Sequence, residues 1–138
     1  MERSTGQDGR QRGRLGTAVL LALTIALGLA SRGGDPVPAL LAAHAGDALW
    51  TVAVHLSLAL VVPRARPAAL AAAALGISWA VELSQLCQAS WLVELRSRRI
   101  GSLLLGTGWQ WLDLARYAVG AALAWALDRS LLERPRRG

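Results

Sequence analysis

The sequence predicts an all-α fold: a polytopic membrane protein with about four transmembrane helices and a short irregular or re-entrant segment before the last. Hydrophobic residues make up 54% of the 138 residues, and they gather in four long apolar segments. These segments have hardly any of the polar residues that would form the solvent-facing side of a helix in a water-soluble protein. With its semi-polar flanks, each segment approaches the roughly 20 residues that span a bilayer. Four such segments in succession are difficult to fold in water, which favours a membrane protein.

The predicted spans follow one another closely along the chain. They cover residues 14–31, 46–63, 67–88 and 109–128. The glycines and prolines of RGGDPVPA predict a loop between the first two spans. PRARP predicts a tight turn before the third span, with Pro67 at the first helical position, where its missing N–H costs nothing.

The stretch from residue 91 to residue 110 is less regular. It combines ELRSRR with IGSLLLGTG, which is apolar but too short and too rich in glycine to span a bilayer. We expect a surface-lying or re-entrant segment there. The chain then divides into a disordered cytoplasmic tail (1–13), a four-helix transmembrane domain (14–128) and a basic cytoplasmic tail (129–138).

All 15 basic residues are arginines, and they lie mostly at the ends of the apolar segments. Cytoplasmic flanks of membrane proteins carry an excess of arginine. With the N-terminus inside, most arginines fall on the cytoplasmic side, and those outside are Arg32, Arg96, Arg98 and Arg99. This bias predicts a multi-pass membrane protein with both termini in the cytoplasm. It also explains the positive charge without a nucleic-acid partner.

The start of the chain has a second interpretation. Arg12 and Arg14, the apolar stretch after them and the small residues around Gly28 are also typical of a cleavable secretory signal. We favour a retained first helix, because three remaining spans would make a very small bundle.

Three carboxylates fall at similar depth in this topology, near the outer ends of their spans: Asp47, Glu82 and Asp113. They are the candidate catalytic groups. On the third span Gln85 shares a helix face with Glu82, and on the fourth Tyr117 shares a face with Asp113. Gln85 and Tyr117 are therefore candidate ligand-binding residues. The arginines on the same side of the membrane, which could receive an anionic group, complete the set: Arg96, Arg98 and Arg99.

The histidines and the cysteine give little support to a metal site. His55 lies about two turns after Asp47, which suits helix packing or a proton relay with that aspartate, and His44 is expected in a loop. The single Cys87 excludes an internal disulfide, and the histidines are not spaced as metal ligands. We expect neither a metal nor a cofactor.

Four motifs resemble those of a bacterial family called domain of unknown function 2809, which is similar to VanZ-like membrane proteins. The motifs are GDALW (46–50), VELSQLCQASWL (81–92), R-x-x-R-x-G-x-L-x-L-G-x-G (96–108) and D-L-x-x-Y-x-x-G (113–120). The resemblance implies an architecture and no activity. VanZ-like proteins carry an acidic residue at the second span, Glu-x-x-Gln on the third and aspartate on the fourth, which implies corresponding roles for Asp47, Glu82 with Gln85, and Asp113.

The sequence also departs from the VanZ-like pattern. Trp50 and Thr51 stand where those proteins often have a histidine, and Tyr117 stands where they often have an asparagine. The resemblance therefore implies the bacterial inner (plasma) membrane and the cell envelope as the compartment, and it does not extend to antibiotic resistance.

Three functional hypotheses follow. In the first, the outward-facing polar cluster binds or processes an anionic envelope compound, such as a lipid-linked phosphate or glycan, with the arginines of ELRSRR receiving the anion. In the second, the chain is a structural or accessory subunit whose polar cluster only holds helices together. In the third, it transports protons or cations as an oligomer. Expected partners are membrane lipids and either a second copy or another membrane protein; whether the protein is an enzyme stays open.

Overall fold

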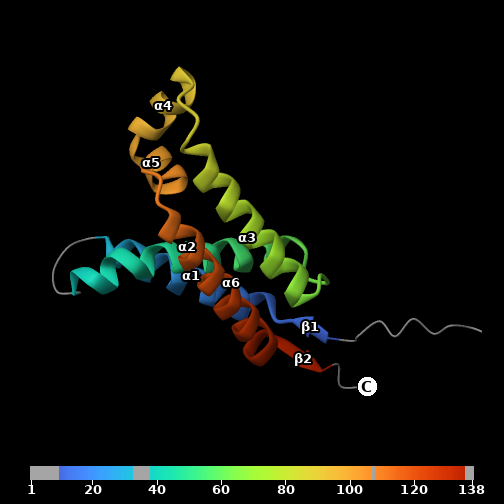
Figure 1. Ribbon diagram of the computed structural model, residues 1–138. Coiled ribbons are helices and arrows are strands. Elements are labelled where there is room, and N and C mark those ends of the chain that lie inside the picture. The colour runs from blue at the N-terminus through green and yellow to red at the C-terminus, as the bar shows by residue number, and fades with distance from the viewer. Residues whose placement is uncertain (1–9, 33–37, 107, 136–138) are drawn as a thin grey trace, which may run out of the picture.

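A computed structural model describes residues 10–32, 38–106 and 108–135 of the chain. Long helices dominate it (Figure 1). In chain order the elements are β1 (Arg10–Arg12), α1 (Arg14–Ser31), α2 (Ala39–Val61), α3 (Pro67–Ser84), α4 (Ser90–Ser97), α5 (Arg99–Leu105), α6 (Trp111–Leu127), a π-helical turn η1 (Asp128–Leu132) and β2 (Glu133–Pro135). The helical fold class predicted from the sequence is confirmed, with one small ribbon of β1 and β2 added to it.

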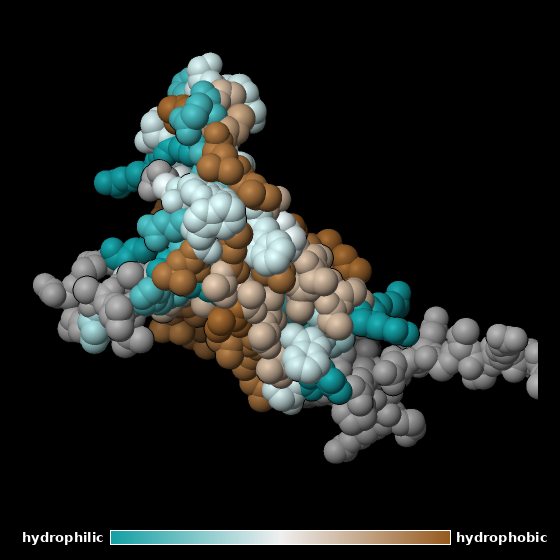
Figure 2. Space-filling model, viewed as in Figure 1, coloured by the Kyte–Doolittle hydropathy of each residue, from teal (hydrophilic) through white to brown (hydrophobic). Residues whose placement is uncertain are grey.

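Three helices are long and apolar enough to cross a membrane: α1, α2 from His44 onward, and α3. The fourth predicted span corresponds to α6, which has 17 residues and is not among these three. Large apolar side chains cover the outside of the bundle; Leu27 is 60% exposed and Leu123 is 52% exposed. Figure 2 shows apolar side chains over the middle of one face and hydrophilic ones toward its ends. Such a surface suits lipid better than water.

Helix α2 lies at the centre and packs against α1, α3 and α6. The α3 and α6 helices run beside each other and cross the pair formed by α1 and α2 (Figure 1). Gly120 allows α6 to approach α2 closely, because a Cβ there would lie 2.4 Å from the backbone oxygen of Ala48 on α2. A small residue at the crossing is the usual way in which membrane helices come this close.

The second helix differs from its prediction. It begins at Ala39, immediately after Pro38, rather than at residue 46. The expectation that His44 lies in a loop is therefore wrong, and Asp47 lies in the third helical turn instead of opening the helix. The proline that predicted a loop in fact precedes the first helical turn, where its fixed φ is compatible with a helix start.

The segment before α6 forms two short helices, α4 and α5, so the irregular alternative of its prediction is wrong, whereas the re-entrant alternative stays a prediction. The third helix ends at Ser84, earlier than the predicted residue 88. Gly101 lets α5 fold against the end of α4, since a Cβ there would lie 1.7 Å from the backbone oxygen of Leu95. Gly106, with φ of 68°, then ends α5. The glycines that predicted irregularity are the positions where the two helices approach and end.

The two strands bring the ends of the described chain together. β1 and β2 pair antiparallel, with Arg10 opposite Pro135 and Arg12 opposite Glu133. The remainder of the predicted tails, residues 1–9 and 136–138, lies outside the described residues.

Candidate functional site

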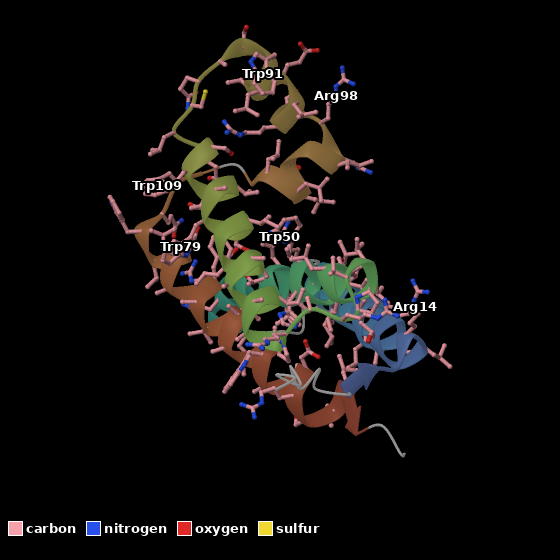
Figure 3. All side chains as sticks on the ribbon, turned by 90° about the vertical axis from the view of Figure 1, so that its right-hand side faces the viewer. Arg14, Trp50, Trp79, Trp91, Arg98 and Trp109 are labelled. Atoms are coloured by element: carbon pink, nitrogen blue, oxygen red, sulfur yellow. The ribbon has the colours of Figure 1, made fainter. Side chains whose placement is uncertain are left out.

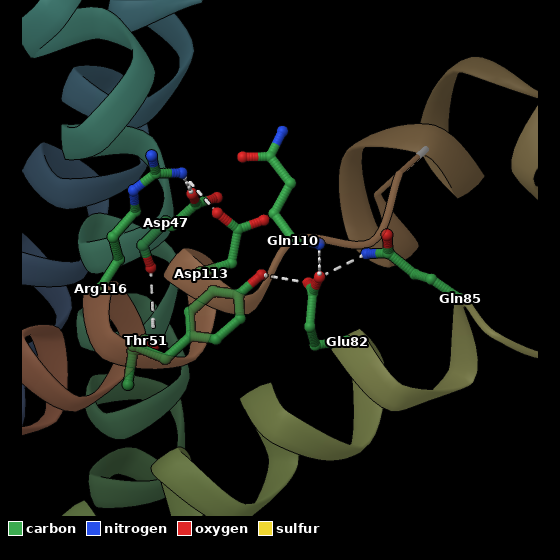
Figure 4. A network of polar contacts seen from close by, with 8 residues as sticks. Asp47, Thr51, Glu82, Gln85, Gln110, Asp113 and Arg116 are labelled. Atoms are coloured by element: carbon green, nitrogen blue, oxygen red, sulfur yellow. Dashed lines mark hydrogen bonds and ion pairs between the residues drawn. The ribbon is translucent and has the colours of Figure 1, made fainter.

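Glu82 is the centre of a polar network inside the bundle (Figure 4). It lies on the buried face of α3 and is fully buried at 0% exposure. Its carboxylate accepts hydrogen bonds from Tyr117 Oη at 3.0 Å, from the backbone N–H of Gln110 at 3.0 Å and from Gln85 Nε2 at 3.2 Å. The donors come from three different parts of the chain, so one carboxylate holds α3, α6 and the segment before α6 together. A buried carboxylate needs such partners to offset its lost hydration.

Arg116 joins the other two carboxylates. Its Nη1 lies 3.1 Å from Asp47 Oδ2 on α2 and also contacts Asp113 Oδ1 on its own helix. The three side chains are mostly buried, with exposures of 14% for Arg116, 22% for Asp47 and 11% for Asp113. The structure therefore brings together all three carboxylates singled out from the sequence, and it adds Arg116 between two of them.

Two further polar pairs lie deeper on the same face of α2. Thr51 Oγ1 lies 3.0 Å from Ser78 Oγ on α3. One turn further, His55 Nε2 lies 2.8 Å from Asp128 Oδ2. All four side chains are buried at 0% exposure. The partner of His55 is thus Asp128, at the far end of α6, and not Asp47 as the relay interpretation expected.

The network forms one wall of a polar cavity of about 280 Å³. Its polar lining residues are Arg32, Asp47, Trp50, Glu82, Gln85, Ser102, Gln110, Asp113 and Tyr117. Two buried polar atoms on these residues have no hydrogen-bond partner within the described part of the chain: Gln85 Oε1, an acceptor, and Trp50 Nε1, a donor. Buried polar groups are nearly always paired. Unpaired atoms also occur on His55, Arg96 and Arg116, which do not line the cavity, so among the described residues Gln85 and Trp50 are the two that lie beside a space for a partner.

Gly106 fixes the position of Gln85 beside this cavity. A Cβ at Gly106 would lie 2.5 Å from Gln85 Nε2, and its positive φ excludes most other residues. The amide also donates to the backbone oxygen of Leu105 at 3.0 Å. Because Nε2 donates both to Leu105 and to the carboxylate of Glu82, Oε1 is the part of Gln85 that remains unpaired.

The arginines of ELRSRR do not line the cavity. Arg96 folds back on the end of α3 and donates to the backbone oxygens of Ser84 and Cys87. Arg98 pairs with exposed Glu94 at 3.4 Å, and Figure 3 shows it far from Trp50, which lines the cavity. Arg99 is exposed at the start of α5.

The arginine that does line the cavity is Arg32, at the end of α1. Sequence reasoning did not select it as a site residue, although the arginine pattern had placed it on the same side of the membrane as the carboxylates. That shared side was the signal that could have identified it.

Metal binding finds no support in the described residues, which contain no group of three or more histidine, cysteine, aspartate or glutamate side chains able to hold an ion. Asp47 and Asp113 face Arg116, and Glu82 faces hydrogen-bond donors, and each carboxylate keeps part of its capacity to accept further hydrogen bonds.

Fold and site together define a small helical membrane protein whose bundle encloses a buried acidic network beside a polar cavity. The chain belongs to the family described as "Protein of unknown function (DUF2809)", whose model matches residues 37–121. This confirms the family resemblance seen in the sequence. The matched range contains every polar lining residue of the cavity except Arg32. No solved structure matches the chain.

Proposed function

We propose that this protein spans the inner membrane four times and binds the polar headgroup of an envelope compound in the cavity, at the extracytoplasmic end of the bundle. The pairing of β1 with β2 supports four spans, because it holds both ends of the described chain on one side. Chain ends on one side require an even number of crossings, so α6 would be the fourth. The excess of arginines at that end favours the cytoplasm for it.

The lining of the cavity indicates which headgroup would fit. Asp47, Glu82 and Asp113 are acceptors, and Arg32 supplies one positive charge at the edge. A headgroup with hydroxyl donors suits the carboxylates, whereas an anionic group suits only the position of Arg32. We therefore retain the hypothesis of an anionic envelope compound, with Arg32 in place of the arginines of ELRSRR as the group that receives the anion.

The unpaired atoms on Gln85 and Trp50 are the single observation that carries this proposal. Gln85 and Trp50 both line the cavity, and a small turn of each side chain would bring the buried oxygen acceptor to a ligand hydroxyl and the buried N–H donor to a ligand oxygen. In this proposal the contacts of Glu82 and Arg116 shape the cavity wall.

The test fills the cavity without touching the network. Gly108 lines the cavity, and a Cβ there would meet nothing within 4 Å, so Gly108→Phe should fold and place a ring in the cavity. Gly76→Phe on the exposed face of α3 is the matched control, because its Cβ also meets open space. The wild type and the two variants are purified from vesicles that contain equal amounts of phosphatidylglycerol and phosphatidylcholine, and the retained lipid is counted by native mass spectrometry.

Phosphatidylglycerol is the probe because it carries a phosphate and a headgroup with hydroxyls, whereas phosphatidylcholine has no hydroxyl donor. We expect the wild type and Gly76→Phe to prefer phosphatidylglycerol, and Gly108→Phe to lose about tenfold of that preference, equivalent to about 1.4 kcal/mol. Equal preference in all three proteins would contradict the proposal and leave the structural role as the better explanation.

A further inference from the structure

A second cavity, larger and apolar, runs along the outside of the bundle between α1, α2 and α5. It has a volume of about 510 Å³, and most of its lining is aliphatic. Leu21 and Ile25 of α1 face Leu49, Ala53 and Val54 of α2 across it. We call it the α1–α2 groove.

The α1–α2 groove adjoins the polar cavity. Four residues line both: Arg32, Trp50, Leu103 and Leu104. The boundary between the two therefore carries a guanidinium and an indole, beside the leucines of α5. A cation at the junction of an apolar groove and a polar cavity is where the phosphate of a lipid would lie, because guanidinium groups bind phosphate strongly.

The length of the groove suits an extended hydrocarbon chain. On α2 its lining extends from Gly46 to Val61. At 1.5 Å of rise per residue this is roughly 22 Å. Half of the hydrocarbon core of a bilayer is only about 15 Å thick. The groove is thus long enough for a full acyl chain or for the first part of an isoprenoid chain.

We propose that the compound bound by this protein is a phosphate-bearing lipid, held by both cavities at once. Its chain lies in the α1–α2 groove, its phosphate lies at Arg32 and Trp50 Nε1, and its hydroxylated headgroup enters the acidic cavity toward Gln85 Oε1. The inference rests on the proposed headgroup binding and adds the class of the compound and the course of its chain. An ordinary boundary lipid would fill the groove without regard to its headgroup, and this difference makes the proposal testable.

The experiment maps where the chain lies. The protein is reconstituted with phosphatidylglycerol or phosphatidylcholine bearing a photoreactive diazirine near the end of one acyl chain, and labelled peptides are identified after illumination. Ala53→Phe blocks the groove, since Ala53 lines it. Ala122→Phe is the matched control on the exposed surface of α6. The cavity variant Gly108→Phe is labelled in parallel.

We expect phosphatidylglycerol to label the groove-lining residues of α1 and α2 more than other lipid-facing positions, and more than phosphatidylcholine does. Ala53→Phe should reduce this label roughly tenfold, in line with a loss of about 1.4 kcal/mol, and Ala122→Phe should leave it unchanged. Gly108→Phe should reduce it as well, because headgroup and chain belong to one molecule.

Three other results would overturn the inference in different ways. Label spread evenly over the lipid-facing positions, with the headgroup preference still lost in Gly108→Phe, would leave the proposed function standing and remove the groove from it. Label in the groove that is equal for both lipids and insensitive to Gly108→Phe would make the groove a site for ordinary boundary lipid. If the wild type showed neither the headgroup preference nor the groove label, the proposed function itself would be refuted.

Discussion

Removing the Tyr117 hydroxyl tests the network most simply. The Tyr117→Phe substitution keeps the ring, which is buried at 5% exposure, and deletes only the donor that lies 3.0 Å from Glu82 Oε2. Nothing is added to the core, so packing should be preserved. The loss of stability then reports the hydrogen bond between α6 and α3.

The structure sets the size of the expected effect. Hydrogen bonds to charged groups contribute about 1.5–3 kcal/mol in proteins, whereas bonds between membrane helices average about 0.6 kcal/mol. Glu82 keeps two other donors, Gln85 and the backbone of Gln110, so the carboxylate is not left without partners. We therefore expect Tyr117→Phe to lower the free energy of unfolding by about 1 kcal/mol, between these two limits.

The assay is reversible unfolding in mixed micelles by titration with sodium dodecyl sulfate. Ser130→Ala is the control, because it also removes one hydroxyl, but from an exposed position where it bonds only within its own helical turn. In a double-mutant cycle with Glu82→Gln, the effect of Tyr117→Phe should shrink by about 0.5 kcal/mol or more. An unchanged stability in Tyr117→Phe, or an effect that Glu82→Gln does not alter, would refute the role given to this contact.

Two further substitutions test the packing and the deeper polar pair by the same titration. Gly120→Leu should cost about 1–3 kcal/mol, because the backbone oxygen of Ala48 occupies the place of its Cβ; Gly76→Leu, in open space, should cost nothing, and equal losses would contradict the close crossing. His55→Leu should cost about 2 kcal/mol, because it removes one hydrogen-bond partner of a fully buried Asp128, and His55→Gln should cost less because it keeps a donor; equal losses would contradict a hydrogen-bonded pair.

Much of the fold follows from local patterns in the sequence. Apolar segment lengths predict the long helices, and the four-residue spacing of Ser78 and Glu82 predicts the face of α3 that is buried. The alternation of helix direction is enough to predict that Asp47, Glu82 and Asp113 lie near one another. These features depend on periodicity and connectivity, which a single sequence contains.

The remainder depends on how short segments turn in space. The expected site used the arginines of ELRSRR, but α4 turns back so that Arg96 contacts the end of α3, and its carbonyl partners carry no sequence signal. Backbone groups such as the N–H of Gln110 are equally invisible in a pattern of side chains. The pairing of His55 with Asp128 depends on the crossing of α2 and α6, which helix periodicity alone does not determine.

The orientation of the cavity is the claim on which the envelope proposal rests, and cysteine labelling tests it most directly. Cys87 is first changed to Ser, and a single cysteine is then placed at one of two exposed positions. Ser97 lies on α4, at the same end of the bundle as the cavity, and Ser130 lies in η1, beyond the opposite end of α6. Intact cells are treated with a membrane-impermeant maleimide. We expect Ser97→Cys to be labelled in intact cells and Ser130→Cys to be labelled only after the inner membrane is opened. The reverse pattern would place the cavity in the cytoplasm and contradict a function at the envelope face.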